Sequence, residues 1–275
     1  MTKRAAVVND LSSFGRCSLT AYIAVLSAMG VRPCPLPTAV LSAQSEFERH
    51  FCRDLTGDMP RFIRAWEENG ERFDCICTGY FASAEQIGFT LDLINKFCAN
   101  GIVLTDPVMG DDGELYPGYD AKAIAAMKKL VSRADVITPN LTELCLLTGA
   151  DYSELANATD EDSFLRDIAA LAKQIMPRLG MIVTGIRSGG DVCSLALCGD
   201  DARTIRRKIA GGRFSGTGDL FSAAVCGCLM NGRSLFDAAE TAADFVSASI
   251  ADTVAVRHDP LYGVEFEKNL IKLVK

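Results

Sequence analysis

The sequence lacks the features that mark several common protein classes. It has no block of Lys and Arg, and its formal net charge is −7, which argues against a nucleic acid or an anionic membrane as partner. No apolar run reaches the roughly 18 residues needed to cross a bilayer. No internal repeat and no low-complexity segment is present. The sequence therefore indicates a globular protein, with small anionic molecules as candidate ligands.

Histidine is also scarce, with two in the chain beside eleven cysteines. The most closely spaced cysteines, Cys75-x-Cys77 and Cys226-x-Cys228, have one residue between them, a spacing that is poor for zinc sites. An odd number of cysteines and the absence of a leader pattern predict reduced, mostly buried thiols in a cytoplasmic protein.

A chain of 275 residues, 49% of them hydrophobic, is long enough to build one substantial core. Short apolar segments alternate with helical patterns, which predicts an α/β protein whose mainly parallel sheet is covered by helices on both faces. Segments 192–197 and 203–209, joined by Gly199-Asp200-Asp201, predict an antiparallel edge hairpin. We expect a single domain over residues 1–275, with further strands at 5–8, 74–80, 102–105, 136–138 and 180–184, an extended edge or flap segment at 33–42, a loop at 111–118, and helices at 17–29, 58–66, 83–97, 121–130, 142–149, 160–176, 220–230 and 234–250.

The stretch from Gly211 to Asp219 combines four glycines, two hydroxyls and a carboxylate before an apolar helical run. Glycines allow backbone N–H groups to converge, and a helix N-terminus adds positive partial charge, so the stretch suits a bound anion. It lacks the lysine of a P-loop, and Phe221 stands where a dinucleotide-binding loop needs Gly or Ala. The remaining alternative is a glycine-rich turn that only starts the helix.

Polar side chains follow three of the expected strands, at Asn9-Asp10, at Asp106, and at Asn140 with Glu143. The carboxyl ends of parallel strands meet at one edge of a sheet, so these groups should line up with the glycine loop. Taken singly, Asp106 is an ordinary turn residue and Glu143 a first-turn helix acid. Together they supply the parts that phosphoryl transfer needs, with Asp219 as acceptor of the proton of the attacking hydroxyl.

These motifs resemble those of the ribokinase-like superfamily, in its pyridoxal/pyridoxamine kinase branch, which is related to the hydroxymethylpyrimidine kinases. The resemblance runs from the first expected strand to the last helix, and it implies a three-layer α/β/α sandwich. The matching segments are Thr78-Gly79-Tyr80, Ser83-Ala84-Glu85-Gln86, Asp106-Pro107-Val108-Met109-Gly110, Thr138-Pro139-Asn140-Leu141-Thr142-Glu143-Leu144, Thr184-Gly185 and Gly216-Thr217-Gly218-Asp219.

The resemblance assigns the chemistry to the glycine loop. Asp219 corresponds to the catalytic base and also lies against the substrate, and the backbone of Gly216, Thr217 and Gly218 corresponds to the anion hole. The implied activity is ATP-dependent phosphorylation of the hydroxymethyl group of pyridoxal, pyridoxamine or pyridoxine, in vitamin B6 salvage. The implied cofactor is Mg²⁺, with a monovalent cation as a further candidate, and the implied assembly is a homodimer.

The resemblance also implies a nucleotide and metal side. Asp106 and Glu143 correspond to the residues that hold Mg²⁺, partly through water, and Asn140 lies beside the ATP phosphates. Thr184 and Gly185 correspond to positions that contact the nucleotide phosphates and sugar.

Two further groups follow from the resemblance. Some kinases of this branch carry lysine where Thr184 stands, so another cation, for which we take Arg187, is expected to help neutralise the phosphates. The implied substrate side comprises Asn9, Ser12, Gln44 and Tyr80, with segment 42–45 as a flap over the ring.

Two alternatives to a pyridoxal kinase stay open. The flap segment 42–47 lacks the His-Thr-Gly type of run common in this branch, which leaves the exact vitamer undecided. The first alternative is a hydroxymethylpyrimidine or phosphomethylpyrimidine kinase, with the same fold and a similar flat heteroaromatic alcohol as substrate. Hydroxymethylpyrimidine kinases usually have Cys where Asp219 stands, so this residue favours the pyridoxal kinases. A non-catalytic vitamer-binding protein is the other alternative, although such a protein would have no use for a base.

Overall fold

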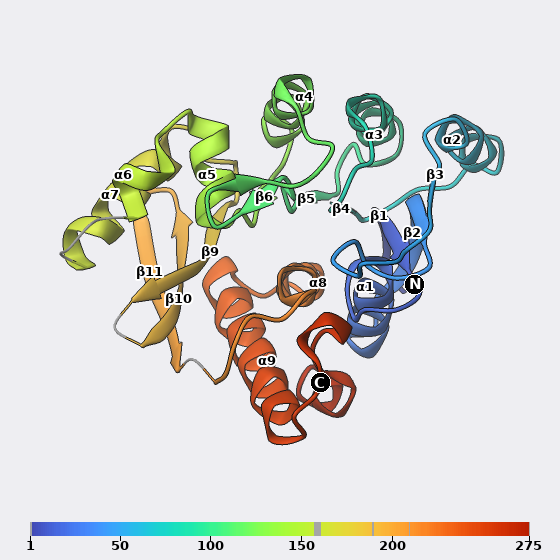
Figure 1. Cartoon of the computed structure of the whole chain (residues 1–275). Helices are drawn as coiled ribbons and strands as arrows, with labels where there is room; N and C mark the ends of the chain where they lie inside the picture. Colours follow the sequence, from blue (N-terminus) through green and yellow to red (C-terminus); the bar gives the residue numbers. More distant parts are fainter. Residues whose placement is uncertain (1, 157–160, 189, 209, 275) are drawn as a thin grey trace.

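The computed structural model describes residues 2–156, 161–188, 190–208 and 210–274, and one central nine-stranded sheet organises them (Figure 1). The strand order is β11-β10-β9-β8-β5-β4-β1-β2-β3. Neighbours from β9 to β2 run parallel, whereas β3 at one end and β10 and β11 at the other are antiparallel. The strands are β1 (Arg4–Ser12), β2 (Arg32–Leu41), β3 (Cys52–Asp54), β4 (Cys75–Thr78), β5 (Ile102–Thr105), β8 (Val136–Ile137), β9 (Gly180–Ser188), β10 (Asp191–Cys198) and β11 (Asp201–Lys208).

Helices cover both faces of this sheet, which confirms the expected three-layer α/β/α sandwich (Figure 1). None of the described helices combines the length and apolar content needed to span a membrane. One layer holds α1 (Ser18–Ala28), α8 (Thr217–Met230) and α9 (Leu235–Ala255), with the 3-10 helices η1 (Pro260–Tyr262) and η2 (Glu267–Lys272) beyond α9. The other layer holds α2 (Met59–Glu68), α3 (Ala84–Phe97), α4 (Ala121–Val131), α5 (Leu141–Thr148), α6 (Tyr152–Ala156) and α7 (Glu161–Lys173).

Alternate residues of the strands enter two separate cores. Ala5 and Val7 of β1 belong to the core under α1, α8 and α9, whereas Ala6 and Val8 belong to the core of the opposite layer. All four are fully buried. Burial on both faces explains why the parallel strands are continuous apolar runs in the sequence.

The N-terminal strands extend further than expected. Strand β1 continues through Asn9 and Asp10 to Ser12, because its parallel pairing with β2 resumes at Leu11 after an irregularity. Residues 33–41 of the expected segment 33–42 lie within β2, which is one strand in from the edge because the short β3 pairs with its outer side. Asn9 is therefore held in a strand instead of a loop.

The expected loop at 111–118 contains a small hairpin, formed by β6 (Gly110–Asp111) and β7 (Glu114–Leu115). Its two-residue turn is Asp112-Gly113, with φ of 49° and 84°. Positive φ at both positions is typical of a type I′ turn, for which Asp-Gly is a favoured sequence. The expectation of a plain loop was wrong because the strands that flank the turn are too short to show a periodic pattern.

The eleven cysteines form no disulfide within the described residues, and most of them are buried, as expected. Three of them nevertheless come together, since Cys75 and Cys77 of β4 lie 3.7 and 3.0 Å from Cys226 of α8 between Sγ atoms. Hydrogen bonding to Cys226 and burial raise the pKa of the Cys75 thiol well above its usual range. In this apolar core the thiols serve as small packing groups.

The side chain of Gln86 ties α3 to β2 and to the loop that carries Tyr80. Gln86 is fully buried, its Oε1 accepts from the Ala82 amide at 2.9 Å, and its Nε2 donates to the Thr38 carbonyl at 2.8 Å. The backbone amide of Gln86 donates to Oγ of Ser83, the N-cap of α3, at 3.3 Å. The Thr38 hydroxyl in turn donates to the Tyr80 carbonyl at 2.9 Å. Gln86 thereby helps to fix one side of the site described below.

The substitution Gln86→Met, which keeps the side-chain length, should lower the free energy of unfolding by about 1 to 3 kcal/mol, because the Ala82 amide loses its partner and the Thr38 carbonyl keeps only the Leu55 amide as donor. Urea unfolding measures this change. The same substitution at the exposed Gln174 is the control, expected to stay within about 0.5 kcal/mol. Equal effects at the two positions would contradict the role given to Gln86.

Candidate active site

The glycine loop ends at the N-terminus of α8, whose first residue is Thr217. Its N-cap, Gly216, has φ of 80°, a left-handed conformation that favours glycine. A Cβ there would lie 2.2 Å from the Arg16 carbonyl oxygen, which excludes larger residues. At Gly218 the space is open, and a Cβ would meet only Asp106 Oδ2, at 3.9 Å. The first amides of α8 therefore lie at an open space beside a carboxylate.

Asp219 lies in the first turn of α8 and is half-buried. Its Oδ1 accepts a hydrogen bond of 3.0 Å from Asn9 Nδ2, and its carboxylate also accepts from the Ser18 amide. Burial, partly offset by these two donors, raises the pKa of Asp219 to about 6. A carboxylate with this pKa is ionised at neutral pH and is a stronger base than an ordinary aspartate.

Asn9 is fully buried and orients the Asp219 carboxylate. Its Oδ1 accepts from the Asp10 amide at 3.0 Å and from the Tyr80 amide at 2.9 Å. The side chain therefore presents its NH₂ group to Asp219. Gly79 makes room for it, since a Cβ at this position would lie 2.4 Å from Asn9 Nδ2.

Ser18, the first residue of α1, is a site residue that the sequence pattern did not reveal. Its φ of 53° is uncommon for a residue other than glycine, and such strain is concentrated at functional sites. In this conformation its amide reaches Asp219 and its side chain hydrogen-bonds Asp10. Tertiary contacts impose the positive φ, so the local sequence carries no signal for it.

Asp106 directly follows β5 and is buried. Its Oδ2 accepts from Ser222 Oγ at 2.9 Å, and Thr138 Oγ1 lies 2.9 Å from the same hydroxyl oxygen. Burial and the charge of Asp219 raise the pKa of Asp106 to about 7. Ser222 is a second residue that the sequence reasoning missed, although its spacing of three from Asp219 places both on one face of α8.

A reciprocal cap holds Asn140 and Glu143 at the start of α5, which begins after Asn140 and not at Thr142 as expected. Asn140 Oδ1 accepts from the Glu143 amide at 2.9 Å, and Glu143 Oε2 accepts from the Asn140 amide at 2.8 Å. Glu143 Oε1 accepts from the Met109 amide at 3.1 Å. Burial and the charge of Asp106 raise the pKa of Glu143. Each carboxylate oxygen keeps a lone pair, which suits contact with a metal through water.

Thr184 lies beside Asn140 through a parallel bridge between β9 and the residue before α5. Gly185 follows it in an exposed position with φ of 71°. Arg187 is exposed further along β9. Burial raises the pKa of Asp111, and the charge of Arg187 counteracts this. Arg187 therefore lies within electrostatic reach of the β6–β7 hairpin.

The expected substrate-side residues are tied to neighbouring elements. Ser12 Oγ donates to Asp10 at 2.8 Å. Gln44 Nε2 donates to the Leu261 carbonyl at 3.3 Å, which connects the flap to η1. The Tyr80 ring lies 6.3 Å from the Tyr119 ring, between centroids. Gln44 therefore contacts η1, and Arg187 acts on the charge of the β6–β7 hairpin.

Six of the expected residues form one connected series. Hydrogen bonds, a backbone bridge and charge interactions link the members in the order Asn9, Asp219, Asp106, Glu143, Asn140, Thr184. Three carboxylates in this series have raised pKa values, chiefly through burial. A divalent cation would relieve their repulsion, and carboxylate oxygens are ligands that Mg²⁺ prefers, so the residues present fit this metal.

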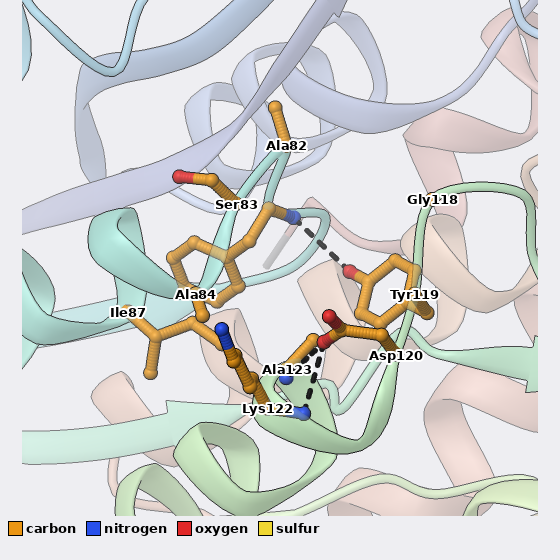
Figure 2. A pocket seen from close by; sticks show the side chains of 10 residues that line it. Ala82, Ser83, Ala84, Ile87, Gly118, Tyr119, Asp120, Lys122 and Ala123 are labelled. Carbon is orange, nitrogen blue, oxygen red and sulfur yellow. Dashed lines mark hydrogen bonds between the residues drawn. The ribbon is translucent and has the colours of Figure 1, made fainter.

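A separate hollow of about 220 Å³ lies between the N-termini of α3 and α4 (Figure 2). Figure 2 shows the Asp120 carboxylate accepting from the amides of Lys122 and Ala123 in α4. The Tyr119 hydroxyl accepts from the Phe81 amide at 3.4 Å. The described residues that line this hollow include none of the expected site residues. The hollow is therefore distinct from the series of acids.

The substitution Asp106→Asn should stabilise the protein. The pKa of about 7 for folded Asp106 lies above the ordinary aspartate value of 3.8, so the penalty for the buried charge is absent below about pH 4 and complete above about pH 7. We expect a gain of about 2 to 4 kcal/mol in the free energy of unfolding at pH 8 and a smaller gain at pH 5. Denaturant titrations at both pH values measure it, with Asp92→Asn on the exposed side of α3 as control. A loss of stability at pH 8 would contradict the expectation.

Comparison with known proteins places the chain among kinases. The phosphomethylpyrimidine kinase family model matches residues 14–262. The pyridoxine/pyridoxal/pyridoxamine kinase of Bordetella avium is 28% identical over 243 residues, which cover 83% of this chain and 78% of that protein.

Two solved structures share the whole fold. A candidate phosphomethylpyrimidine kinase from Bacteroides thetaiotaomicron, in a crystal form with pyridoxal, is 35% identical with a TM-score of 0.90, and the match covers 99% of this chain and 96% of that one. The pyridoxal kinase from Lactobacillus plantarum is 28% identical with a TM-score of 0.88, over 99% of this chain and 97% of that one.

These likenesses confirm the expected ribokinase-like fold and the expectation that the chain is an enzyme of the kinase class. The family match extends from the loop after β1 to η1, and so includes the glycine loop and all three buried carboxylates. This chain belongs to the phosphomethylpyrimidine kinase family of ribokinase-like enzymes.

Proposed function

We propose that this protein uses ATP and Mg²⁺ to phosphorylate the exocyclic hydroxymethyl group of pyridoxal, pyridoxamine or pyridoxine. The observation that carries the proposal is the Asp219 carboxylate, oriented by Asn9 at the N-terminus of α8. The names of the Bordetella and Lactobacillus relatives and the pyridoxal in the Bacteroides crystals support the choice of substrate. A single domain over residues 1–275 and a cytoplasmic homodimer are further parts of the proposal.

In this proposal Asp219 is the general base. The substrate hydroxyl oxygen forms a bond to the γ-phosphorus of ATP, the bond from that phosphorus to the β–γ bridging oxygen breaks, and the hydroxyl proton passes to Asp219. The transition state is loose and the proton leaves late, so a carboxylate is a sufficient base. The amides of Gly216, Thr217 and Gly218 stabilise the negative charge on the transferred group.

The acids at the strand ends form the metal side. Asp106 and Glu143 hold Mg²⁺, partly through water, and the ion neutralises phosphate charge when it is bound. Asn140, Thr184 and Gly185 bind the nucleotide phosphates and sugar, and a monovalent cation is a further candidate ligand there.

The substrate side is formed around the first strand. Asn9, Ser12, Gln44 and Tyr80 contact the vitamer, and segment 42–45 covers its ring. The hydrogen bond between Gln44 and Leu261 supports this role for the flap, because it holds the segment over the end of the site.

A second candidate function is phosphorylation of hydroxymethylpyrimidine or its monophosphate. The match to the phosphomethylpyrimidine kinase family favours it, because both substrates are flat heteroaromatic alcohols. Asp219 weighs against it, on the resemblance given above.

Turnover assays decide between these substrates. ADP formation is measured with pyridoxal, pyridoxamine, pyridoxine and hydroxymethylpyrimidine, each with ATP and Mg²⁺. We expect phosphorylation of at least one vitamer at a higher kcat/KM than that of the pyrimidine. Binding of a vitamer with no ADP formed from any alcohol would instead identify a vitamer-binding protein.

The pH profile tests the base. Ionised Asp219 accepts the proton, so kcat/KM should fall as the pH decreases through about 6. Asp219→Asn should lower kcat roughly 10²-fold or more, since a positioned base is lost. Asp167→Asn, at an exposed position of α7, should leave kcat unchanged. Near-full kcat in Asp219→Asn would show that another group takes the proton.

A further inference from the structure

Arg213 lies in the glycine loop, three residues before the Gly216 cap. Its guanidinium forms ion pairs with Asp111 and with Asp112 of the β6–β7 hairpin. Its side chain is 48% exposed, and that of Asp112 is 65% exposed. These pairs join two loops that are about a hundred residues apart in the chain.

Hydrogen bonds to α5 and its N-cap hold the hairpin that carries Asp111 and Asp112. The Gly113 amide donates to Thr142 Oγ1 at 2.8 Å, and Asn140 Nδ2 donates to the Gly110 carbonyl at 2.8 Å. The hairpin is thereby fastened to the start of α5, which carries Asn140 and Glu143. Arg213 is thus held next to the proposed phosphate side of the site.

Arg213 keeps its positive charge in this position. Partial burial lowers the pKa of Arg213, but the charges of Asp111 and Asp112 raise it overall. The guanidinium therefore stays protonated throughout the physiological range.

The ion pairs of Arg213 with Asp111 and Asp112 are weak enough to be replaced by a phosphate. Ion pairs between exposed groups stabilise a protein by about 0 to 1 kcal/mol. A guanidinium can bind a phosphate through two parallel charge-assisted hydrogen bonds, which are stronger than an exposed ion pair. The triphosphate can therefore displace the acids.

We propose that Arg213 is a ligand of the terminal phosphates of a nucleoside triphosphate, and that Asp111 and Asp112 hold its guanidinium beside the site until the nucleotide binds. The inference rests on the proposed function and adds a phosphate ligand to it. Arg213 leaves the two acids and reaches across the glycine loop to the phosphates.

Binding of ATP, ADP and adenosine to the full chain with Mg²⁺, measured by calorimetry without any alcohol, tests the proposal. Arg213→Met should weaken ATP binding roughly tenfold to hundredfold and leave adenosine binding unchanged, which also shows that the variant is folded. The double substitution Asp111→Asn with Asp112→Asn should bind ATP at least as tightly as the wild type, because it releases the guanidinium.

Arg207 provides a matched control. This residue of β11 also bridges two acids, Glu240 and Asp244, but these lie on α9 and not on the β6–β7 hairpin. Arg207→Met should leave ATP affinity unchanged. If the double substitution weakens ATP binding as much as Arg213→Met does, Arg213 only fastens the loops and the proposal is overturned. Equal ATP affinity of the wild type and Arg213→Met also overturns this inference, but leaves the proposed function in place. A wild-type chain that binds no ATP overturns this inference and the proposed function together.

Discussion

The hydrogen bond from the Asn9 side chain to the Asp219 carboxylate joins two residues 210 positions apart, and the geometry of the site depends on it. Asn9 can make this bond because two backbone amides fix its carbonyl oxygen and because Gly79 has no side chain to obstruct it. The first strand, the glycine loop and the turn after β4 therefore meet at one carboxylate. A change in any of these segments would move the proposed base relative to the amides of α8.

The acids near this bond oppose folding. Asp106 follows β5, Glu143 lies in the first turn of α5 and Asp219 lies in the first turn of α8, and burial raises the pKa of each. Hydrogen bonds from backbone amides, asparagine and serine offset part of this penalty. Such an arrangement destabilises the protein without a ligand, and it is favourable once a cation and a polyanionic nucleotide share the site.

Loops complete the site around this rigid centre. The β6–β7 hairpin is fastened to α5, the flap is fastened to η1 through Gln44, and Arg213 connects the glycine loop to the hairpin. The strands and helices thus fix the acids, whereas exposed ion pairs and single hydrogen bonds hold the surrounding loops. Contacts of this strength can exchange when a ligand binds.

The sequence alone determined the order of the longer strands and helices, the glycine loop and the acids at the strand ends, because hydrophobic periodicity and glycine content are local properties and parallel strands end at one sheet edge. It also pointed to Asn140 and Glu143, whose capping box lies within four residues. It did not reveal β3, α6 or the β6–β7 hairpin, which are too short to show a periodic pattern. Only the tertiary structure decided the roles of Ser18 and Ser222, the continuation of β1 through Asn9, and the meeting of Arg213 with Asp111. Each of these depends on contacts between segments that are separated in the chain, and no local pattern encodes a contact with a separate segment.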